Sequence, residues 1–319
     1  MIVLATGGAG FIGSHLADAL IERGDLVTVI DDLSSGRRAN LEAALAAGAE
    51  LLEGDVLDPD FVMDVATGLR PDAIVHFAAQ GEVRRSIDEP AFDATANVVG
   101  TINMLEAGRA AGTERFVLAS TGGAIYGEGE DIDLPAAESA PMAPLCPYGL
   151  SKLAAEQYLD LYRRMYGSGS VALRFANVYG PRQNPKGEAG VVAIFCELLL
   201  SGDRPVVFGD GGQTRDYVFI DDVIEAVLAA TTGEVQGPVN IGTGVETGLM
   251  DLIARIAAAA AGTGIEPAGF EPGFEPARPG EVRRIAVDPS RARQELGWQA
   301  TTSLEQGLLK TLEALLPGR

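Results

Sequence analysis

The feature that most constrains this chain is a glycine-rich turn between an apolar strand and an amphipathic helix, close to its start. In the stretch ATGGAGFIGSHLADAL, three glycines follow the apolar run 2–6 in a G-x-x-G-x-x-G spacing. Glycines permit a tight turn and a close approach of the backbone to a pyrophosphate, and the helix N-terminus supplies N–H donors. A glycine triplet alone is a weak signal, but its place between strand and helix predicts a dinucleotide-binding unit. Its predicted cofactor residues are Gly7, Gly10, Phe11, Ile12 and Gly13.

The first half of the chain alternates strand-like and helix-like segments. Strands are predicted at 2–6, 26–31, 49–55, 72–79, 115–120 and 170–177, and helices at 11–23, 39–47, 61–67, 91–111 and 148–166. Alternating units of this kind form a parallel sheet with helices on both faces and right-handed crossovers. We therefore predict an α/β fold with a doubly wound Rossmann sheet, whose strand ends form a ligand crevice.

The rhythm changes after residue 177. Helices are predicted at 191–201, 221–230 and 249–260, with two more at the end, short strands in PVVFGD, RDYVFI and PVNIG, and loops at 179–190 and 264–281. This half predicts a smaller, mixed α/β substrate-binding domain laid over the sheet. We assign 1–177 plus about 216–241 to the dinucleotide-binding domain, and about 178–215 plus 242–319 to the smaller one.

Composition excludes several classes of function. With 24 Lys and Arg against 45 Asp and Glu, the net charge is −21, which argues against nucleic acid or an anionic membrane as partner. No apolar run is long enough to span a membrane, and the first residues lack the pattern of a secretory signal. The two cysteines, Cys146 and Cys196, cannot form a disulfide framework, so we expect a cytoplasmic protein. The two histidines, His15 and His76, are expected to pack inside the fold, and no metal site is predicted.

Acidic and small residues follow the predicted strands. Asp31 and Asp32 end the second strand, where a carboxylate accepts hydrogen bonds from a ribose and repels a 2′-phosphate. The cofactor is therefore predicted to be NAD rather than NADP. Asp55 and Val56 after the third strand are candidates to hold the adenine. The fourth strand ends in HFAAQ, whose small residues let the backbone pass close to the cofactor. Phe77, Ala78 and Ala79 are therefore predicted cofactor contacts.

A tyrosine and a lysine stand four residues apart at the head of the predicted helix 148–166. Tyr148 and Lys152 lie on one helix face at this spacing. A tyrosine becomes a base when nearby cations, here the lysine ammonium and an oxidised nicotinamide, lower its pKa. The spacing is common by chance, but the preceding LASTGGAIYG brings the hydroxyls of Ser120 and Thr121 toward the same crevice.

These motifs together resemble a known family. TGGAGFIG, HFAA, NVVGT, STGGAIYG, PYGLSK, RFANVYGPRQ and RDYVFIDDV are similar to the extended short-chain dehydrogenases/reductases, specifically the nucleotide-sugar epimerases and dehydratases, over nearly the whole chain. Within that family the pattern most resembles the enzymes that interconvert UDP-glucose and UDP-galactose. The resemblance implies NAD as cofactor, a UDP-sugar as substrate, and Asn97 and Phe175 as further cofactor contacts.

The resemblance also implies a mechanism. Tyr148, assisted by Lys152, takes the proton of the sugar 4-hydroxyl while the C4 hydride moves to NAD, and the hydride returns to the other face of a 4-keto sugar. One position departs from the family pattern, because Gly122 stands where a catalytic serine or threonine is usual. We expect Thr121 to assist Tyr148 in its place, with Ser120 hydrogen-bonding near the nicotinamide. Dehydratases and decarboxylating relatives carry an acid in this segment, and its absence here favours simple epimerisation.

The resemblance places the nucleotide sugar over the second half of the chain. The arginines of TRDYVF and ARPGEVRR are expected to neutralise the diphosphate, because guanidinium groups bind phosphate in a bidentate manner. A helix start in GEAGVVAIF favours phosphate, and the residues of VVFGD are expected to pack on the uracil. The predicted substrate residues, besides Thr121 and Tyr148, are Asn177, Val191, Val206, Phe208, Arg215 and Arg278.

Three alternatives stay open. Ile285 matches a gate position that separates unmodified hexoses from N-acetyl sugars, but its size is intermediate. A UDP-N-acetylhexosamine or UDP-glucuronate 4-epimerase is therefore the main rival, although Asn184 stands where uronate enzymes tend to carry an arginine, with Arg182, Lys186 and Arg84 as other cations. A non-catalytic dinucleotide sensor is the third reading. The helices 91–111 and 150–166 are apolar enough to pair with those of a second copy, which predicts a homodimer.

Overall fold

The computed structural model describes residues 1–185, 190–267, 269–278 and 281–316. A parallel seven-stranded sheet runs through it in the order β11-β6-β5-β4-β1-β2-β3. The strands are β1 Ile2–Thr6, β2 Leu26–Asp31, β3 Glu50–Glu53, β4 Ala73–His76, β5 Arg115–Thr121, β6 Gly169–Phe175 and β11 Gly237–Ile241. Most of these strands are nearly continuous apolar runs, as expected for strands covered on both faces. The predicted doubly wound α/β fold is confirmed.

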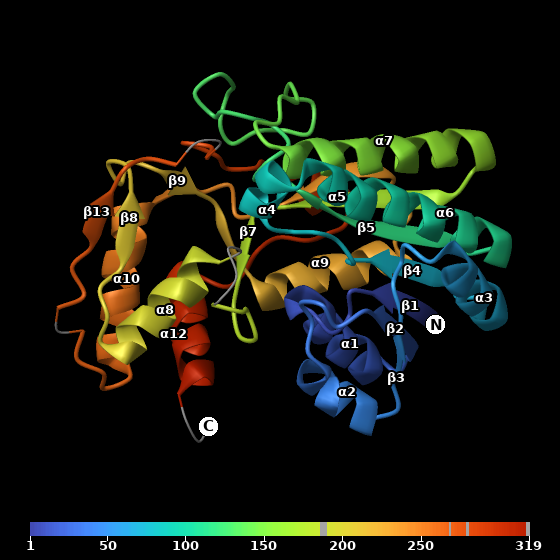
Figure 1. Cartoon of the computed structure of the whole chain (residues 1–319), viewed down its shortest axis with the longest axis horizontal. Coiled ribbons are helices and arrows are strands. Elements are labelled where there is room, and N and C mark those ends of the chain that lie inside the picture. Colours follow the sequence, from blue (N-terminus) through green and yellow to red (C-terminus); the bar gives the residue numbers. More distant parts are fainter. Residues whose placement is uncertain (186–189, 268, 279–280, 317–319) are drawn as a thin grey trace.

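Helices cover both faces of the sheet (Figure 1). One face carries α3 Pro59–Leu69, α6 Gly100–Ala111 and α7 Pro147–Tyr166, and the other carries α1 Phe11–Arg23, α2 Glu42–Ala46 and α9 Ile220–Thr232. In α1 the buried Leu16, Ala17 and Leu20 recur at helical spacing, so one face of that helix packs on the sheet. Two short helices, α4 Val83–Asp88 and α5 Pro90–Ala94, lie between β4 and α6.

The strand order reverses between β1 and β4. The chain moves outward from β1 to β2 and β3, then returns to pair β4 with the other side of β1. Ligands of open parallel sheets bind at such a switch point, outside the carboxyl ends of the strands. The glycine turn after β1 and the residues after β4 and β5 therefore all face one crevice.

A smaller lobe lies beside the carboxyl ends of the sheet (Figure 1). It holds the strand pairs β7 Asn177–Tyr179 with β10 Tyr217–Phe219, β9 Thr214–Arg215 with β12 Thr247–Gly248, and β8 Val206–Phe208 with β13 Gly273–Glu275. Its helices are α8 Val191–Ser201, α10 Leu249–Gly262 and α12 Leu304–Leu315, whereas α11 Ser290–Glu295 packs on β11 at the edge of the main sheet. Of these, α10 packs against both α8 and α12.

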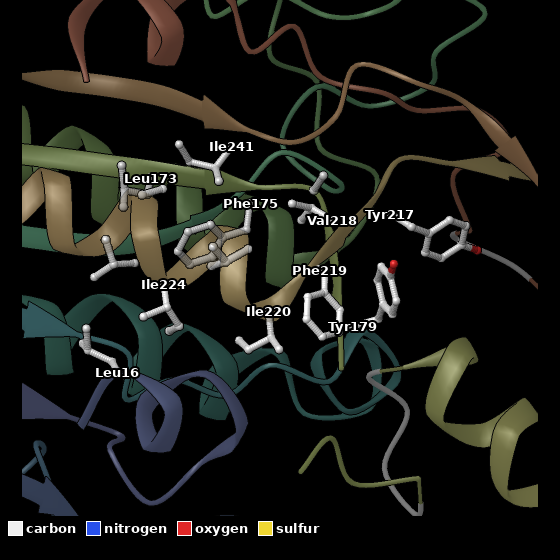
Figure 2. Packing of buried hydrophobic residues seen from close by; sticks show 14 of the residues in the cluster. Leu16, Leu173, Phe175, Tyr179, Tyr217, Val218, Phe219, Ile220, Ile224 and Ile241 are labelled. Carbon is white, nitrogen blue, oxygen red and sulfur yellow. The ribbon is translucent and has the colours of Figure 1, made fainter. Parts of the chain in front are cut away.

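One apolar cluster joins the sheet to this lobe (Figure 2). Leu173 and Phe175 of β6 and Ile241 of β11 meet α9, and the cluster continues into the aromatic residues Tyr179 and Phe219. Because this core is continuous, the lobe is held in a fixed position beside the ends of β5 and β6.

The predicted helix 91–111 is three segments. After α5 the chain forms a π-helical turn, Thr95–Val99, before α6 begins at Gly100. The wider turn lets Asn97 reach back to the segment after β4, where it accepts from the backbone N–H of Gln80 and donates to its carbonyl. Periodicity alone could not show this turn, because its cause is a contact with another strand end.

Other boundaries also differ from the predictions. The predicted helix 39–47 is a 3₁₀ turn, Arg38–Leu41, followed by the short α2, because Asn40 is drawn onto the carbonyl of Ala9. The sixth strand ends at Phe175, and Asn177 opens β7 instead, since its N–H donates to the carbonyl of Asp216. The helix α4 and the strand β13, which lies within the predicted loop 264–281, were both missed.

Candidate active site

The glycine turn after β1 forms an open cradle at the N-terminus of α1. Gly7 has φ of 67°, and a Cβ there would lie 2.6 Å from the backbone nitrogen of Ala78, at the end of β4. A Cβ on Gly13 would lie 2.3 Å from the carbonyl oxygen of Gly7, so only glycine lets the helix begin so close to the turn. Gly10 is the N-cap, and Phe11 and Ile12 begin the helix half-buried. The first N–H groups of an α-helix have no partner within the helix, so this helix start beside bare backbone suits a pyrophosphate.

Asp31 fixes this cradle to the end of β2. One carboxylate oxygen accepts the N–H of Ala9 at 2.8 Å, the other accepts the N–H of Leu33 at 2.9 Å, and burial raises the pKa of the group. A carboxylate has about four acceptor positions, so two remain for the hydroxyls of a ribose. Asp32 is exposed, and its carboxylate accepts hydrogen bonds from the N–H and the hydroxyl of Ser34. Asp31 is thus the better placed of the two predicted carboxylates.

The other predicted cofactor residues differ in burial. Asp55 is exposed and accepts the N–H of Leu57, while Val56 is buried beneath α6. Phe77 and Ala78 are half-buried and Ala79 is exposed, whereas Phe175 lies in the core with its ring 6.4 Å from that of Phe77. Asn97 is buried with its amide engaged inside the protein. The glycine cradle and the Asp31 acceptors fit a dinucleotide of the NAD type.

Tyr148, Lys152 and Thr121 converge at the carboxyl end of β5. The hydroxyl of Thr121 faces the phenol of Tyr148, in the first turn of α7, and acts to lower the pKa of that phenol. Lys152, one turn on, is buried and donates from Nζ to the carbonyl oxygen of Ala119 at 3.0 Å. Pro147 occupies the first position of the helix, where proline is favoured. A Cβ on Gly149 would lie 2.4 Å from the carbonyl oxygen of Ala124, so the first turn of α7 packs tightly against the segment that follows β5.

Burial shifts both groups of this pair toward their neutral forms. It raises the pKa of Tyr148 to about 12, and it lowers the pKa of Lys152 to about 8. His76 lies behind them between Thr6 and Thr101, and burial lowers its pKa to about 3, so it is a neutral packing residue. The protein alone therefore does not make Tyr148 acidic, and a further positive charge is needed.

Gly122 has no room for a side chain. A Cβ there would lie 2.6 Å from Cγ1 of Val287 and 3.2 Å from the carbonyl oxygen of Arg174. A serine or threonine at this position would collide with the segment that crosses from the smaller lobe. The hydroxyl of Thr121, one residue earlier, is the one that reaches Tyr148.

Ser120 belongs to a buried polar cluster behind the site. Its hydroxyl donates to Oε1 of Glu156 at 2.5 Å, and Arg174 binds the same carboxylate with Nε at 3.0 Å and Nη2 at 2.6 Å. Arg174 also donates to the Tyr126 hydroxyl, which donates to Asn240 on β11. The cluster joins β5, α7, β6 and β11, so it sets the position of the helix that carries Tyr148. A contact of Ser120 with nicotinamide stays a prediction.

Sequence reasoning missed this cluster, although two signals were present. Glu156 follows Lys152 by four residues, as Lys152 follows Tyr148, and all three share one helix face. Arg174 is a lone charge inside the apolar run SVALRF. A charge in a buried strand requires a buried partner.

The two predicted phosphate ligands lie in the smaller lobe. Arg215 donates from Nη1 to the carbonyls of Thr214 and Arg283, and burial lowers its pKa. Among the described residues it has no hydrogen bond to a carboxylate. Arg278 lies over the ring of Phe208, 3.1 Å from its centroid, with Glu281 at 3.9 Å. An anion between the two guanidinium groups would compensate their charge.

The remaining predicted substrate residues lie on β7, α8 and β8. Val191 begins α8 as predicted and is half-buried, and Val206 at the start of β8 is exposed. The amide oxygen of Asn177 lies near Gly123, 3.5 Å from where a Cβ would stand. Within the described part of the chain, no group of three or more His, Cys, Asp or Glu is placed to hold a metal, and no helix could span a membrane.

The sequence was compared with known proteins. Residues 3–242 match the NAD dependent epimerase/dehydratase family. The UDP-glucose 4-epimerase of Mycolicibacterium smegmatis is 46% identical over 315 residues, which cover 98% of each chain.

Solved structures agree with this result. A UDP-glucose 4-epimerase from Thermotoga maritima, in complex with UDP-glucose, is 43% identical with a TM-score of 0.92, covering 98% of both chains. A Thermus thermophilus UDP-glucose 4-epimerase in complex with NAD is 39% identical, with a TM-score of 0.90 and the same coverage. From the match over most of its length and these full-length relatives, the chain belongs to the NAD dependent epimerase/dehydratase family.

Proposed function

We propose that this protein is an isomerase that interconverts UDP-glucose and UDP-galactose by inverting C4 of the sugar. The observation that carries the proposal is the convergence of Thr121, Tyr148 and Lys152 beside a glycine cradle suited to NAD. The M. smegmatis and T. maritima relatives are UDP-glucose 4-epimerases, which supports the choice of substrate.

In this proposal Tyr148 is the general base, which takes the proton of the sugar 4-hydroxyl and later returns it. Thr121 donates a hydrogen bond to the phenolate and so stabilises it. The ammonium of Lys152, anchored on Ala119, favours the same charged form electrostatically. When bound, NAD supplies the hydride acceptor and the positive charge that the buried phenol requires. Arg215 and Arg278 hold the diphosphate while the sugar turns over.

Elimination of water is not supported by the residues around Tyr148. Dehydration requires an acid beside the sugar, and the segment after Thr121 is Gly122, Gly123 and Ala124, without a carboxylate. Since a Cβ at Gly122 would collide with Val287, no side chain could extend from that position. Epimerisation needs only the base and its hydroxyl partner.

Of the three cations that could bind a uronate, Arg84 is exposed on α4. Arg182 forms an ion pair with Asp18 of α1 at 2.7 Å, and Lys186 lies outside the described residues. Ile285 is buried in the core. An unmodified hexose is therefore the proposed substrate.

The test is to supply UDP-glucose, UDP-glucuronate and UDP-N-acetylglucosamine separately and follow the C4 epimers by NMR. UDP-glucose should give the highest kcat/KM, and faster turnover of another sugar would replace it as substrate.

The positive charge of NAD⁺ should lower the pKa of Tyr148 from its value of about 12 in the protein alone. A raised pKa keeps the phenol protonated at neutral pH, so NAD⁺ binding releases a proton between the two pKa values. NAD⁺ affinity should then rise with pH in that window. Ultraviolet absorbance of phenolate, titrated with and without NAD⁺, measures the shift. Tyr148→Phe should abolish it, and a shift that persists in this variant would assign it to another tyrosine.

We propose that the protein is a homodimer formed by α7 and the segments packed on it. Large apolar side chains are exposed there: Leu150 is 59% exposed, Val99 44% and Tyr158 38%. Leu150→Glu should shift sedimentation from dimer to monomer, because it would place an uncompensated charge in the interface. Leu26→Glu is the control, since Leu26 is 68% exposed at the start of β2, away from α7. A wild-type monomer would contradict the proposal.

The domain division proposed from the sequence rests on sheet membership. In the segment 216–241, α9 packs on β5 and β6 and β11 pairs with β6, so both belong with the main sheet. β10 at the start of that segment pairs with β7 outside the main sheet, where β8, β12 and β13 also lie. A cytoplasmic location is likewise proposed, and the free, buried Cys146 and Cys196 support it.

A further inference from the structure

A buried carboxylate on α5, near the helix of the catalytic pair, forms no ion pair with any residue that the structure describes. Asp93 on α5 is fully buried. Its Oδ1 accepts hydrogen bonds from Nε2 of Gln80 at 2.9 Å and Nδ2 of Asn97 at 3.2 Å. Its Oδ2 has no hydrogen-bond partner among the residues that the structure describes. A buried ionised carboxylate is unfavourable unless an opposite charge compensates it.

Hydrogen bonds connect Asp93 to the first turn of α7. Nδ2 of Asn97 also donates to Oγ of Ser151 at 2.9 Å, and Ser151 donates to the carbonyl oxygen of Tyr148 at 3.0 Å. Ser151 lies between Tyr148 and Lys152 in the sequence, and α5 packs directly on α7. Asp93 is therefore two side chains away from the turn that carries the base.

The other titratable groups near this turn are paired, exposed to solvent or neutral. The carboxylate of Glu156 is bound by Arg174 and Ser120, so its field at Lys152 is largely cancelled. On α4, which packs against both helices, the charged groups Arg84, Arg85 and Asp88 are exposed and screened by solvent. The remaining titratable neighbours, His76 and Cys146, are neutral, because burial lowers the pKa of the histidine and raises that of the thiol.

Lys152 is the cation that Asp93 can compensate. Burial lowers the pKa of Lys152 to about 8, and the charge of Asp93 is the largest influence that opposes this shift, ahead of Glu156. Asp93 also opposes the ionisation of Tyr148. Removing its charge should make both groups lose their protons at lower pH.

We propose that Asp93 is a positioning residue that acts as the buried counter-charge of Lys152, keeping it an ammonium and setting the pH range in which the Tyr148–Lys152 pair works. The consequence for turnover rests on the proposed epimerase function. The protonation of Lys152 does not depend on that function, so the proposal about Asp93 and the proposed epimerase function can fail separately.

The chain has lysines only at 152, 186 and 310, which makes a direct titration practical. With ¹⁵N-labelled lysine, the side-chain signals can be assigned by Lys186→Arg and Lys310→Arg. Asp93→Asn keeps an oxygen for Gln80 and Asn97 and removes only the charge. It should lower the titration midpoint of Lys152 by about one pH unit, while the exposed Asp88→Asn should leave it unchanged. An unchanged midpoint in Asp93→Asn would overturn the proposal, whatever the enzyme's activity.

A second variant covers failure of Asp93→Asn to fold. Asp93→Ser keeps a hydroxyl oxygen that can accept from Gln80 and Asn97 and also removes the charge, so it should lower the titration midpoint of Lys152 in the same direction as Asp93→Asn. No change there would also overturn the proposal. If UDP-glucose is turned over as proposed, both limbs of the pH–rate profile should move to lower pH in Asp93→Asn, which a purely structural role would not produce.

Discussion

Replacing Tyr148 by phenylalanine is expected to lower kcat for UDP-glucose by about a thousandfold, within the range of general acid–base catalysis. The change removes the phenol oxygen and leaves the ring, so α7 should pack as before. Lys152, the glycine cradle and Asp31 are untouched, and NAD should still bind. Conversion to UDP-galactose, followed by NMR, gives the rate, and isothermal calorimetry gives the NAD affinity.

Tyr158→Phe is the matched control for this experiment. Tyr158 lies on the same helix and is 38% exposed, so it should keep the wild-type rate. If Tyr148→Phe converted UDP-glucose as fast as the unaltered protein, Tyr148 would not be the base. Loss of NAD binding together with activity would instead point to a structural role.

Replacing Glu156 by alanine is expected to lower the free energy of unfolding by about 3–5 kcal/mol, the cost of leaving one partner of a buried ion pair uncompensated. The side chains of Glu156 and Arg174 are only 5% and 2% exposed, and they meet at 2.6 Å. Without the carboxylate, Arg174 keeps its charge in the core and Ser120 loses its acceptor. Urea unfolding followed by circular dichroism measures the change.

Asp160→Ala is the matched control, because it removes a carboxylate from the same helix. Asp160 pairs with Arg163 and Arg164, but its side chain is 38% exposed. Exposed pairs contribute at most about 1 kcal/mol, so this variant should unfold close to the wild type. Equal losses in the two variants would show that the buried cluster does not hold α7 in place.

The sequence predicted the parts of the site that depend on local pattern. The strand–turn–helix context of Gly7 and Gly13 was sufficient to place the cradle, and the spacing of Tyr148 and Lys152 was sufficient to place both on one face of α7. These features need only a few consecutive residues. For the same reason the alternation of strands and helices predicted the sheet.

The parts that were missed depend on contacts between distant segments. Glu156 was not predicted as the partner of the Ser120 hydroxyl, because this contact follows only from how α7 lies on β5. The π-helical turn at Asn97 exists because Gln80 needs its amide. Gly122 could be explained only when Val287, from the other lobe, was seen to fill the space.

The most direct test of the central claim uses UDP-glucose carrying deuterium at C4. If hydrogen leaves C4 and returns to its opposite face within one closed site, the UDP-galactose formed should retain the label in full. Mass spectrometry of the product decides the question. Loss of deuterium to water in step with conversion would contradict the account, since C4 would then exchange its hydrogen with solvent.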